Sequence, residues 1–182
     1  MKLVSNVIAI SLFLSCAAYA GQGSALGALK GSAGAVSISV PASSPARALR
    51  DEAAERALAS DVLDLSPNYA DFLVSYARNE GYTVLELDGA RMTSKAALLD
   101  HATRVLRFPG VPENWDAMID FIGDLPGIHR NRHLLIVTRN AGLISRADAS
   151  LYADFREVAE FACRNAREWS KGDLTIKFAF VQ

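Results

Sequence analysis

The sequence predicts an α/β domain built on a small, three-stranded parallel sheet with packed helices. Three apolar runs have the length and composition of strands, at residues 83–87 (TVLEL), 133–138 (HLLIVT) and 174–180 (LTIKFAF). Helical patterns separate each run from the next. Strands joined through helices need crossover connections, and such connections place the strands parallel within one sheet.

The helices of this domain have recognisable ends. Thr93 or Ser94 is suited to cap a helix that runs to about Leu106, and a second, long helix is expected over residues 148–169. An acidic helix lies between them after the loop at 108–113, and Gly and Pro residues at 123–127 predict that it breaks there. The expected domain therefore covers residues 82–182.

The first twenty residues have the organisation of a signal peptide. Lys2 precedes an apolar run at 3–14, and Ala-Tyr-Ala at 18–20 is a small-x-small cleavage site. The run is too short to span a membrane, so we expect a bacterial protein that is periplasmic or secreted, without stable membrane insertion after cleavage. Two alternatives remain open, a lipoprotein attached through Cys16 and a cytoplasmic protein whose true start lies downstream.

Residues 21–65 are expected to form a linker that is partly helical. The stretch is rich in Gly, Ala and Ser up to Pro45, and a weakly amphipathic helix is predicted over 46–63. Residues 66–81 contain a stronger helix, 67–79, with Ser66 as its cap and Gly81 at its end. We expect this flanking helix to pack at the edge of the domain, and residues 82–182 to fold without it because they hold every predicted strand.

Composition and motifs exclude several classes of protein. The net charge of −1 over 182 residues and the lack of a basic stripe argue against nucleic-acid binding. After cleavage Cys163 is the only cysteine, so no internal disulfide forms. His129 and His133 flank two arginines and are not expected to hold a metal. Because no catalytic constellation is present, we expect no enzyme, no metal and no cofactor.

The most informative stretch is residues 108–125, which carries no Lys or Arg and four acids, Glu113, Asp116, Asp120 and Asp124. The three aspartates recur every four residues and therefore share one helical face, a like-charge arrangement that costs roughly 0.2–0.5 kcal/mol per pair. Asn114 is suited to cap this helix. Its opposite, apolar face is formed by Trp115, Met118, Ile119 and Ile122. The acidic face is either simply solvated or meets a cationic partner.

The run PENWDAMID at 112–120, placed after a strand and a helix, resembles the barstar family of intracellular ribonuclease inhibitors. The resemblance spans about residues 82–182 and matches the expected order of strands and helices. It implies that Asp116 and Asp120 enter the basic active site of a ribonuclease, with Asn114 and Trp115 positioning the helix. Glu113 and Asp124 would then add long-range attraction.

Several positions depart from the family pattern. The loop before Asn114 is one residue shorter, Val111 or Pro112 stands in place of an aromatic residue, and Ile119 replaces a tryptophan. A further family acid at the start of the last long helix has only Asp148 nearby. We expect a monomeric inhibitor or immunity protein that binds a cationic ribonuclease or toxin. The alternative is an envelope-located interaction module of the same fold without nuclease inhibition.

Overall fold

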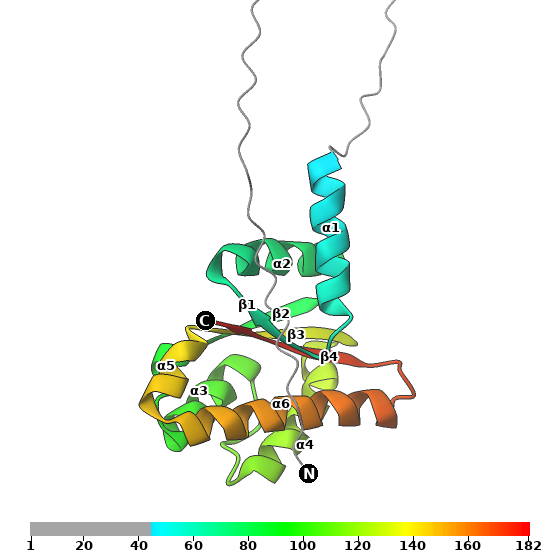
Figure 1. The fold of residues 1–182 in the computed structure, drawn as a ribbon. Coiled ribbons are helices and arrows are strands. Elements are labelled where there is room, and N and C mark those ends of the chain that lie inside the picture. Colours follow the sequence, from blue (N-terminus) through cyan, green and yellow to red (C-terminus); the bar gives the residue numbers. More distant parts are fainter. Residues whose placement is uncertain (1–44) are drawn as a thin grey trace, which may run out of the picture. The chain divides into compact units, whose positions relative to one another are not determined.

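The structure is a computed structural model that describes residues 45–182, all within one compact unit (Figure 1). The predicted signal peptide, 1–20, and residues 21–44 of the predicted linker lie outside the described residues. The strands are β1 (Val62–Leu65), β2 (Thr83–Asp88), β3 (His133–Arg139) and β4 (Thr175–Val181). The helices are α1 (Pro45–Leu58), α2 (Pro67–Asn79), the short 3-10 helix η1 (Gly89–Arg91), α3 (Lys95–Leu106), α4 (Trp115–His129), α5 (Ala141–Ala147) and α6 (Ala149–Trp169).

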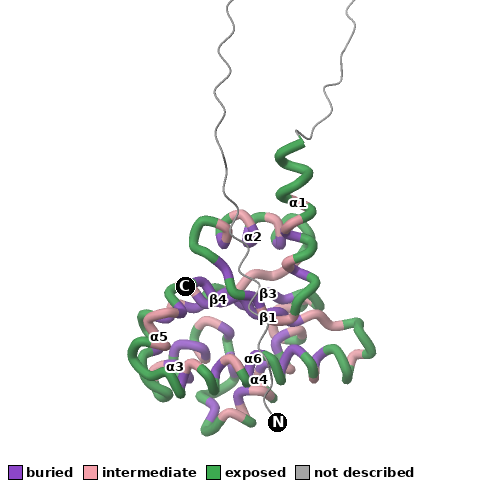
Figure 2. Tube along the Cα trace, in the orientation of Figure 1, coloured by how far each residue is buried: buried purple, intermediate pink, exposed green. Residues whose placement is uncertain are grey.

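The strands form one parallel sheet in the order β1-β4-β3-β2. The predicted α/β class with a parallel sheet is therefore confirmed, but the sheet has four strands rather than three. Figure 2 shows the strands as a buried layer between helices whose outer surfaces are exposed. None of the helices in residues 45–182 is long and apolar enough to cross a membrane.

The first core lies on the face of the sheet that α3, α4, α5 and α6 cover. Leu134 and Ile136 of β3 point to this side, together with alternate residues of β4. The ring of Phe155 on α6 meets the rings of Phe178 and Phe180 edge to face, with centroid distances of 6.2 and 5.6 Å. Such T-shaped contacts add to the stabilisation from apolar burial.

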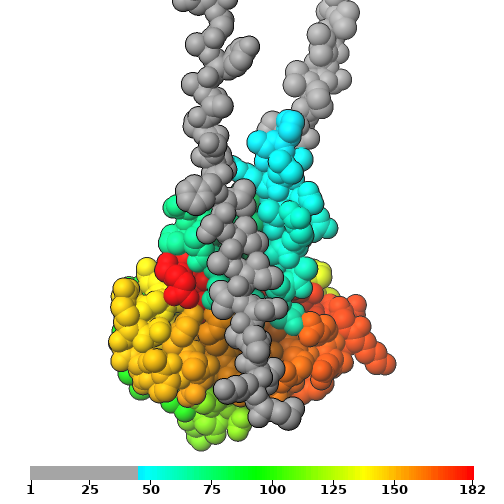
Figure 3. Space-filling view, viewed as in Figure 1, coloured from blue at the N-terminus to red at the C-terminus, as the bar shows by residue number. Residues whose placement is uncertain are grey.

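A second core lies on the opposite face, beneath α1 and α2. Here Leu135 and Val137 of β3 pack against Leu73 and other apolar residues of α2. Figure 3 shows α1 in cyan above α6 in orange, in keeping with their places on opposite faces of the sheet. We expected the flanking helix at the edge of the domain, and this prediction is wrong. Helix α2 instead covers one face of the sheet, whose strands carry apolar residues on both faces.

The fourth strand lies in the segment that was expected to be linker and helix. The helix predicted over 46–63 ends at Leu58, and β1 pairs with β4, with Leu65 opposite Val181. Leu63 and Leu65 are buried on either side of the exposed Asp64, which is the alternation of a strand. Asp64 receives two hydrogen bonds from Arg156 of α6, at 2.5 and 3.0 Å, so the strand is also tied to the helix layer.

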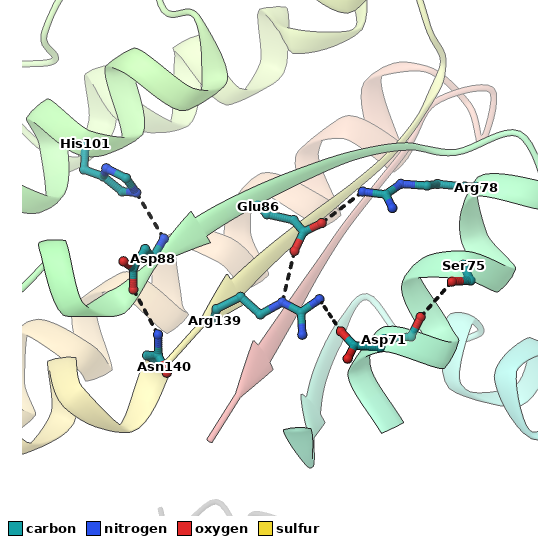
Figure 4. Close-up of polar contacts among 8 residues, drawn as sticks. All are labelled: Asp71, Ser75, Arg78, Glu86, Asp88, His101, Arg139 and Asn140. Carbon is teal, nitrogen blue, oxygen red and sulfur yellow. Dashed lines mark hydrogen bonds and ion pairs between the residues drawn. The ribbon is translucent and has the colours of Figure 1, made fainter. Parts of the chain in front are cut away.

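Ion pairs join α2 to the sheet (Figure 4). Arg139 of β3 contacts Asp71 of α2 at 2.7 Å and Glu86 of β2 at 3.0 Å, and Arg78 of α2 contacts Glu86 at 2.9 Å. Exposed pairs contribute little one by one, but a network on a partly buried arginine orients the elements that it joins. The reason for expecting residues 82–182 to fold alone therefore fails, since β1 and the two helices that cover the second core precede residue 82.

Candidate functional site: the acidic helix α4

Helix α4 begins as the sequence predicts. The side-chain Oδ1 of Asn114 accepts a hydrogen bond from the backbone N–H of Ala117 at 2.8 Å, which satisfies one free donor of the first turn. The predicted break at 123–127 is wrong, because α4 continues through Gly123 and Pro126 to His129. Pro126 removes one backbone hydrogen bond, but the buried Leu125 and the partly buried Ile128 hold that turn on the core.

The three aspartates lie on the exposed side of α4. Asp116, Asp120 and Asp124 are all exposed, and the helix spans all of them, so their spacing of four residues places them on one face. Within residues 45–182 none of them forms an ion pair or a side-chain hydrogen bond. Glu113, in the preceding loop, is exposed and unpaired in the same way.

Several acidic residues elsewhere in the described part of the chain are, in contrast, paired with arginines. Asp64, Asp71 and Asp100 each pair with an arginine at 2.7 Å or less. On α3, for example, Asp100 has Arg104 one turn away at 2.7 Å, whereas each aspartate of α4 has another aspartate at that spacing. The chain thus carries a concentrated negative face with no cation of its own among the described residues.

Trp115 is held in place by its neighbours rather than free. Its Nε1–H donates to Oδ2 of Asp154 on α6 at 3.3 Å, and the Lys95 ammonium lies 4.5 Å from the ring centroid. The ring is partly buried against the first core. Trp115 therefore joins α4 to α3 and α6, which supports a role in orienting the helix.

The departures from the family pattern have different structural outcomes. Val111 is 56% exposed at the entrance to α4, whereas Pro112 is buried. Ile119 is turned toward the core, where it is partly buried. Asp148 caps α6: its Oδ1 accepts hydrogen bonds from the Ser150 side chain and from the backbone N–H groups of Ser150 and Leu151, at 2.7, 2.9 and 3.0 Å. The hydrogen bond from the Ser150 side chain is the main cause of the lowered pKa of Asp148.

The carboxyl end of β2 holds a polar cluster that the sequence analysis did not find (Figure 4). The backbone N–H of Asp88 donates to Nε2 of His101 at 3.0 Å, and Nδ2 of Asn140 donates to Oδ1 of Asp88 at 3.0 Å. Burial lowers the pKa of His101, and the hydrogen bond from Asn140 lowers the pKa of Asp88. These groups satisfy one another, so the cluster joins β2, α3 and the loop after β3.

The cluster also explains one glycine. A Cβ atom on Gly89 would lie 2.4 Å from the carbonyl oxygen of Asn140, which is closer than real Cβ contacts occur. Gly89 is therefore required for this close backbone approach.

The other two histidines and Cys163 make structural contacts. Nε2 of His129 lies 3.0 Å from the Leu106 carbonyl oxygen, whereas the His133 ring lies against Tyr82 with a centroid distance of 5.5 Å. No group of three or more potential metal ligands occurs in the part of the chain that the structure describes. Burial raises the pKa of the Cys163 thiol to about 12, so this cysteine is a packing residue and not a nucleophile.

Of three comparisons with known proteins, one gives a match. Neither the curated proteins nor the solved structures yield a match to this chain. The family model described as Barstar (barnase inhibitor) matches residues 82–181, which include β2, α3, α4, β3, α5, α6 and β4. That match covers more than half of the sequence and contains the acidic helix, and we conclude that the chain belongs to the barstar family.

Proposed function

We propose that this protein is an inhibitor or immunity protein that binds the basic active site of a ribonuclease or related toxin through α4. Members of the barstar family are inhibitors rather than enzymes, and the family implies a ribonuclease-type partner. The observation that carries the proposal is the exposed row Asp116, Asp120 and Asp124, which has no cation within residues 45–182.

In the proposed complex, Asp116 and Asp120 replace substrate phosphates and pair with active-site Arg, Lys or His side chains. Such pairs are charge-assisted hydrogen bonds, and carboxylates accept from arginine with two parallel bonds. Asn114 fixes the first turn of α4 through its cap, and Trp115 fixes the helix against α6. The face is therefore ordered before binding, which lowers the entropic cost of association.

Glu113 and Asp124 have a different role in this proposal. Both are exposed, and they lie before and after the two central aspartates. Charges at the rim of an interface mainly raise the association rate, and their effect falls with ionic strength.

The site of action is also a proposal. We propose export after cleavage behind Ala20, so that the monomeric inhibitor intercepts a toxin in the periplasm or outside the cell. A lipoprotein anchored through Cys16 would act in the same compartment. A cytoplasmic inhibitor that protects the cell from its own ribonuclease is the third possibility, if the true start is downstream.

The experiment is an inhibition assay with barnase, combined with calorimetry at low and high salt. The Asp120→Ala change should weaken binding by about 2–5 kcal/mol, the range typical of charged pairs at interfaces, barnase–barstar among them. Glu113→Ala should mainly slow association. Both variants should melt like the wild type, since neither side chain has a partner in the described residues.

The matched control is Glu52→Ala. Glu52 is an exposed helical acid on α1, which covers the opposite face of the sheet from α4. The Glu52→Ala variant should inhibit the ribonuclease as the wild type does. If Asp120→Ala unfolds the domain, the acidic face is structural and the proposed function is wrong.

The second candidate is an interaction module of the envelope with the same fold and no nuclease inhibition. It is favoured by Val111, an exposed aliphatic residue where the family has an aromatic ring, and by Ile119, which faces the core. A wild-type protein that binds no barnase-like enzyme at low salt would decide for this candidate.

A further inference from the structure

A pocket of about 370 Å³ lies where α1, α2 and the amino ends of β2 and β3 meet. Its walls include the rings of Tyr76, Tyr82 and His133, and its apolar part is Leu58 and Ala59. Tyr82 and His133 contact each other with a centroid distance of 5.5 Å. The pocket is open to solvent, and Glu55, Ala59, Glu80 and His133 of its lining are exposed. The pocket lies on the side of the second core, whereas α4 packs on the first core, and it is independent of the inhibitor function proposed above.

Two carboxylates, Glu55 of α1 and Glu80 at the end of α2, complete the lining. Neither forms an ion pair or a side-chain hydrogen bond within residues 45–182, although other acids of α1 pair with arginines one turn away. The lining includes no Lys or Arg. The pocket therefore offers negative charge beside aromatic rings without an internal cation to neutralise it.

The pKa values of the two tyrosines are raised in part by the same negative charges. Partial burial raises the pKa of Tyr76, and the charges of Glu80, Glu55 and Asp51 raise it further. Partial burial and the charge of Glu80 likewise raise the pKa of Tyr82. The carboxylates and phenol rings thus converge on one space, although they come from α1, from α2 and from the turn between α2 and β2.

We propose that this pocket binds a small organic ammonium ion, with the rings of Tyr76 and Tyr82 around its methyl groups and Glu55 and Glu80 balancing its charge. Aromatic rings attract cations through the negative potential of their faces, and quaternary ammonium groups are recognised in this way. An anionic or neutral ligand of the same size has no such attraction here. The site exists only because α1 and α2 cover the sheet. Glu55, Tyr76 and Glu80 lie before residue 82, where the match to the family model begins.

The test is a titration of the full-length protein with choline, followed by NMR of the backbone amides of Gly81, Tyr82 and His133. The control ligand is 3,3-dimethylbutan-1-ol, which has the shape of choline but no charge. Choline should bind with a dissociation constant of about 1 mM, the affinity expected of a small, open site. The neutral alcohol should cause at least about tenfold weaker shifts at equal concentration.

Two variants locate the site. Tyr76→Leu and Glu80→Gln should each weaken choline binding about fivefold or more, since each removes one of the two attractive elements. Glu160→Gln, on the exposed side of α6, should bind choline as the wild type does. Circular dichroism should show that all three variants keep the wild-type fold, because Glu80 and Glu160 are exposed and leucine retains an apolar side chain at the partly buried Tyr76.

The source of the ammonium group is tested separately. Vesicles of phosphatidylcholine present the same group next to an anionic phosphate, which the carboxylates would repel, so the protein should not sediment with them. The proposal is overturned if choline and the neutral alcohol shift the same amides equally, or if Glu80→Gln binds choline as tightly as the wild type. Sedimentation with vesicles but no binding of free choline would also overturn it.

Discussion

The layer formed by α1 and α2 should be part of one cooperative domain, and the substitution Leu73→Ala tests this. Leu73 is fully buried in the second core, between α2 and the sheet. The change removes three carbon atoms and leaves a cavity, which typically costs about 2–5 kcal/mol. For a unit of this size that corresponds to a fall in melting temperature of roughly 5–15 °C.

The two tryptophans make the assay selective. Trp115 is on α4 and Trp169 is on α6, so both lie on the side of the first core, across the sheet from Leu73. If the two layers unfold together, Leu73→Ala will lower the midpoint of the fluorescence transition as much as that of the far-ultraviolet circular dichroism. If the fluorescence midpoint stays in place while the dichroism splits into two steps, α1 and α2 are an appendage and this reasoning is wrong.

The control uses the same chemical change in an exposed position. Leu49 on α1 is 64% exposed, so Leu49→Ala deletes the same atoms without creating a cavity. It should change the free energy of unfolding by less than about 0.5 kcal/mol. A comparable loss in both variants would mean that the cavity at Leu73 is not the cause, because alanine favours a helix at least as well as leucine does.

Three further predictions follow from the same contacts. Gly89→Ala should destabilise the protein by about 2 kcal/mol or more, because its Cβ would meet the Asn140 carbonyl oxygen at 2.4 Å; a wild-type chemical denaturation curve would contradict this. The neutral ring of His101 accepts a hydrogen bond, and burial lowers the pKa of this residue below its ordinary value of 6.5. The contribution of His101 to stability should therefore be complete above pH 6.5 and should fall as the pH drops toward the folded-state pKa. Denaturation at several pH values should show a smaller loss between pH 7 and pH 5 for His101→Gln than for the wild type, and equal losses would refute the role of His101. Mass spectrometry of the native protein should find an N-terminus at Gly21, whereas an intact Met1 in the cytosol would refute export and a lipid on Cys16 would replace it with a lipoprotein.

The sequence predicted three of the four strands almost to the residue. The runs expected at 83–87, 133–138 and 174–180 correspond to β2, β3 and β4. The long apolar runs of β3 and β4 follow from their burial on both faces of the sheet, whereas β2 is a partly buried edge strand. The missed strand, β1, has four residues and a polar one among them. So short a run carries little periodicity, and its strand character comes from pairing with β4 at the other end of the chain.

The acidic helix shows a similar division. The cap at Asn114 and the common face of Asp116, Asp120 and Asp124 follow from local spacing, and the structure contains both. That Trp115 is held by Asp154 and Lys95 was beyond the sequence, because these residues come from α6 and α3. The role of Asp116, Asp120 and Asp124 in binding a partner stays a prediction until the inhibition assay is made.

The sequence by itself determined the α/β class, the order of the main elements, the acidic face and the likeness to the barstar family. These features depend on residue type and on spacings within a few turns, which local sterics and burial translate directly into helices and strands. Only the tertiary structure decided that residues 45–81 supply a fourth strand and the helices of the second core, and that Glu55, Tyr76 and Glu80 meet at one pocket. Such contacts join residues far apart along the chain, and packing free energy rather than local preference selects them.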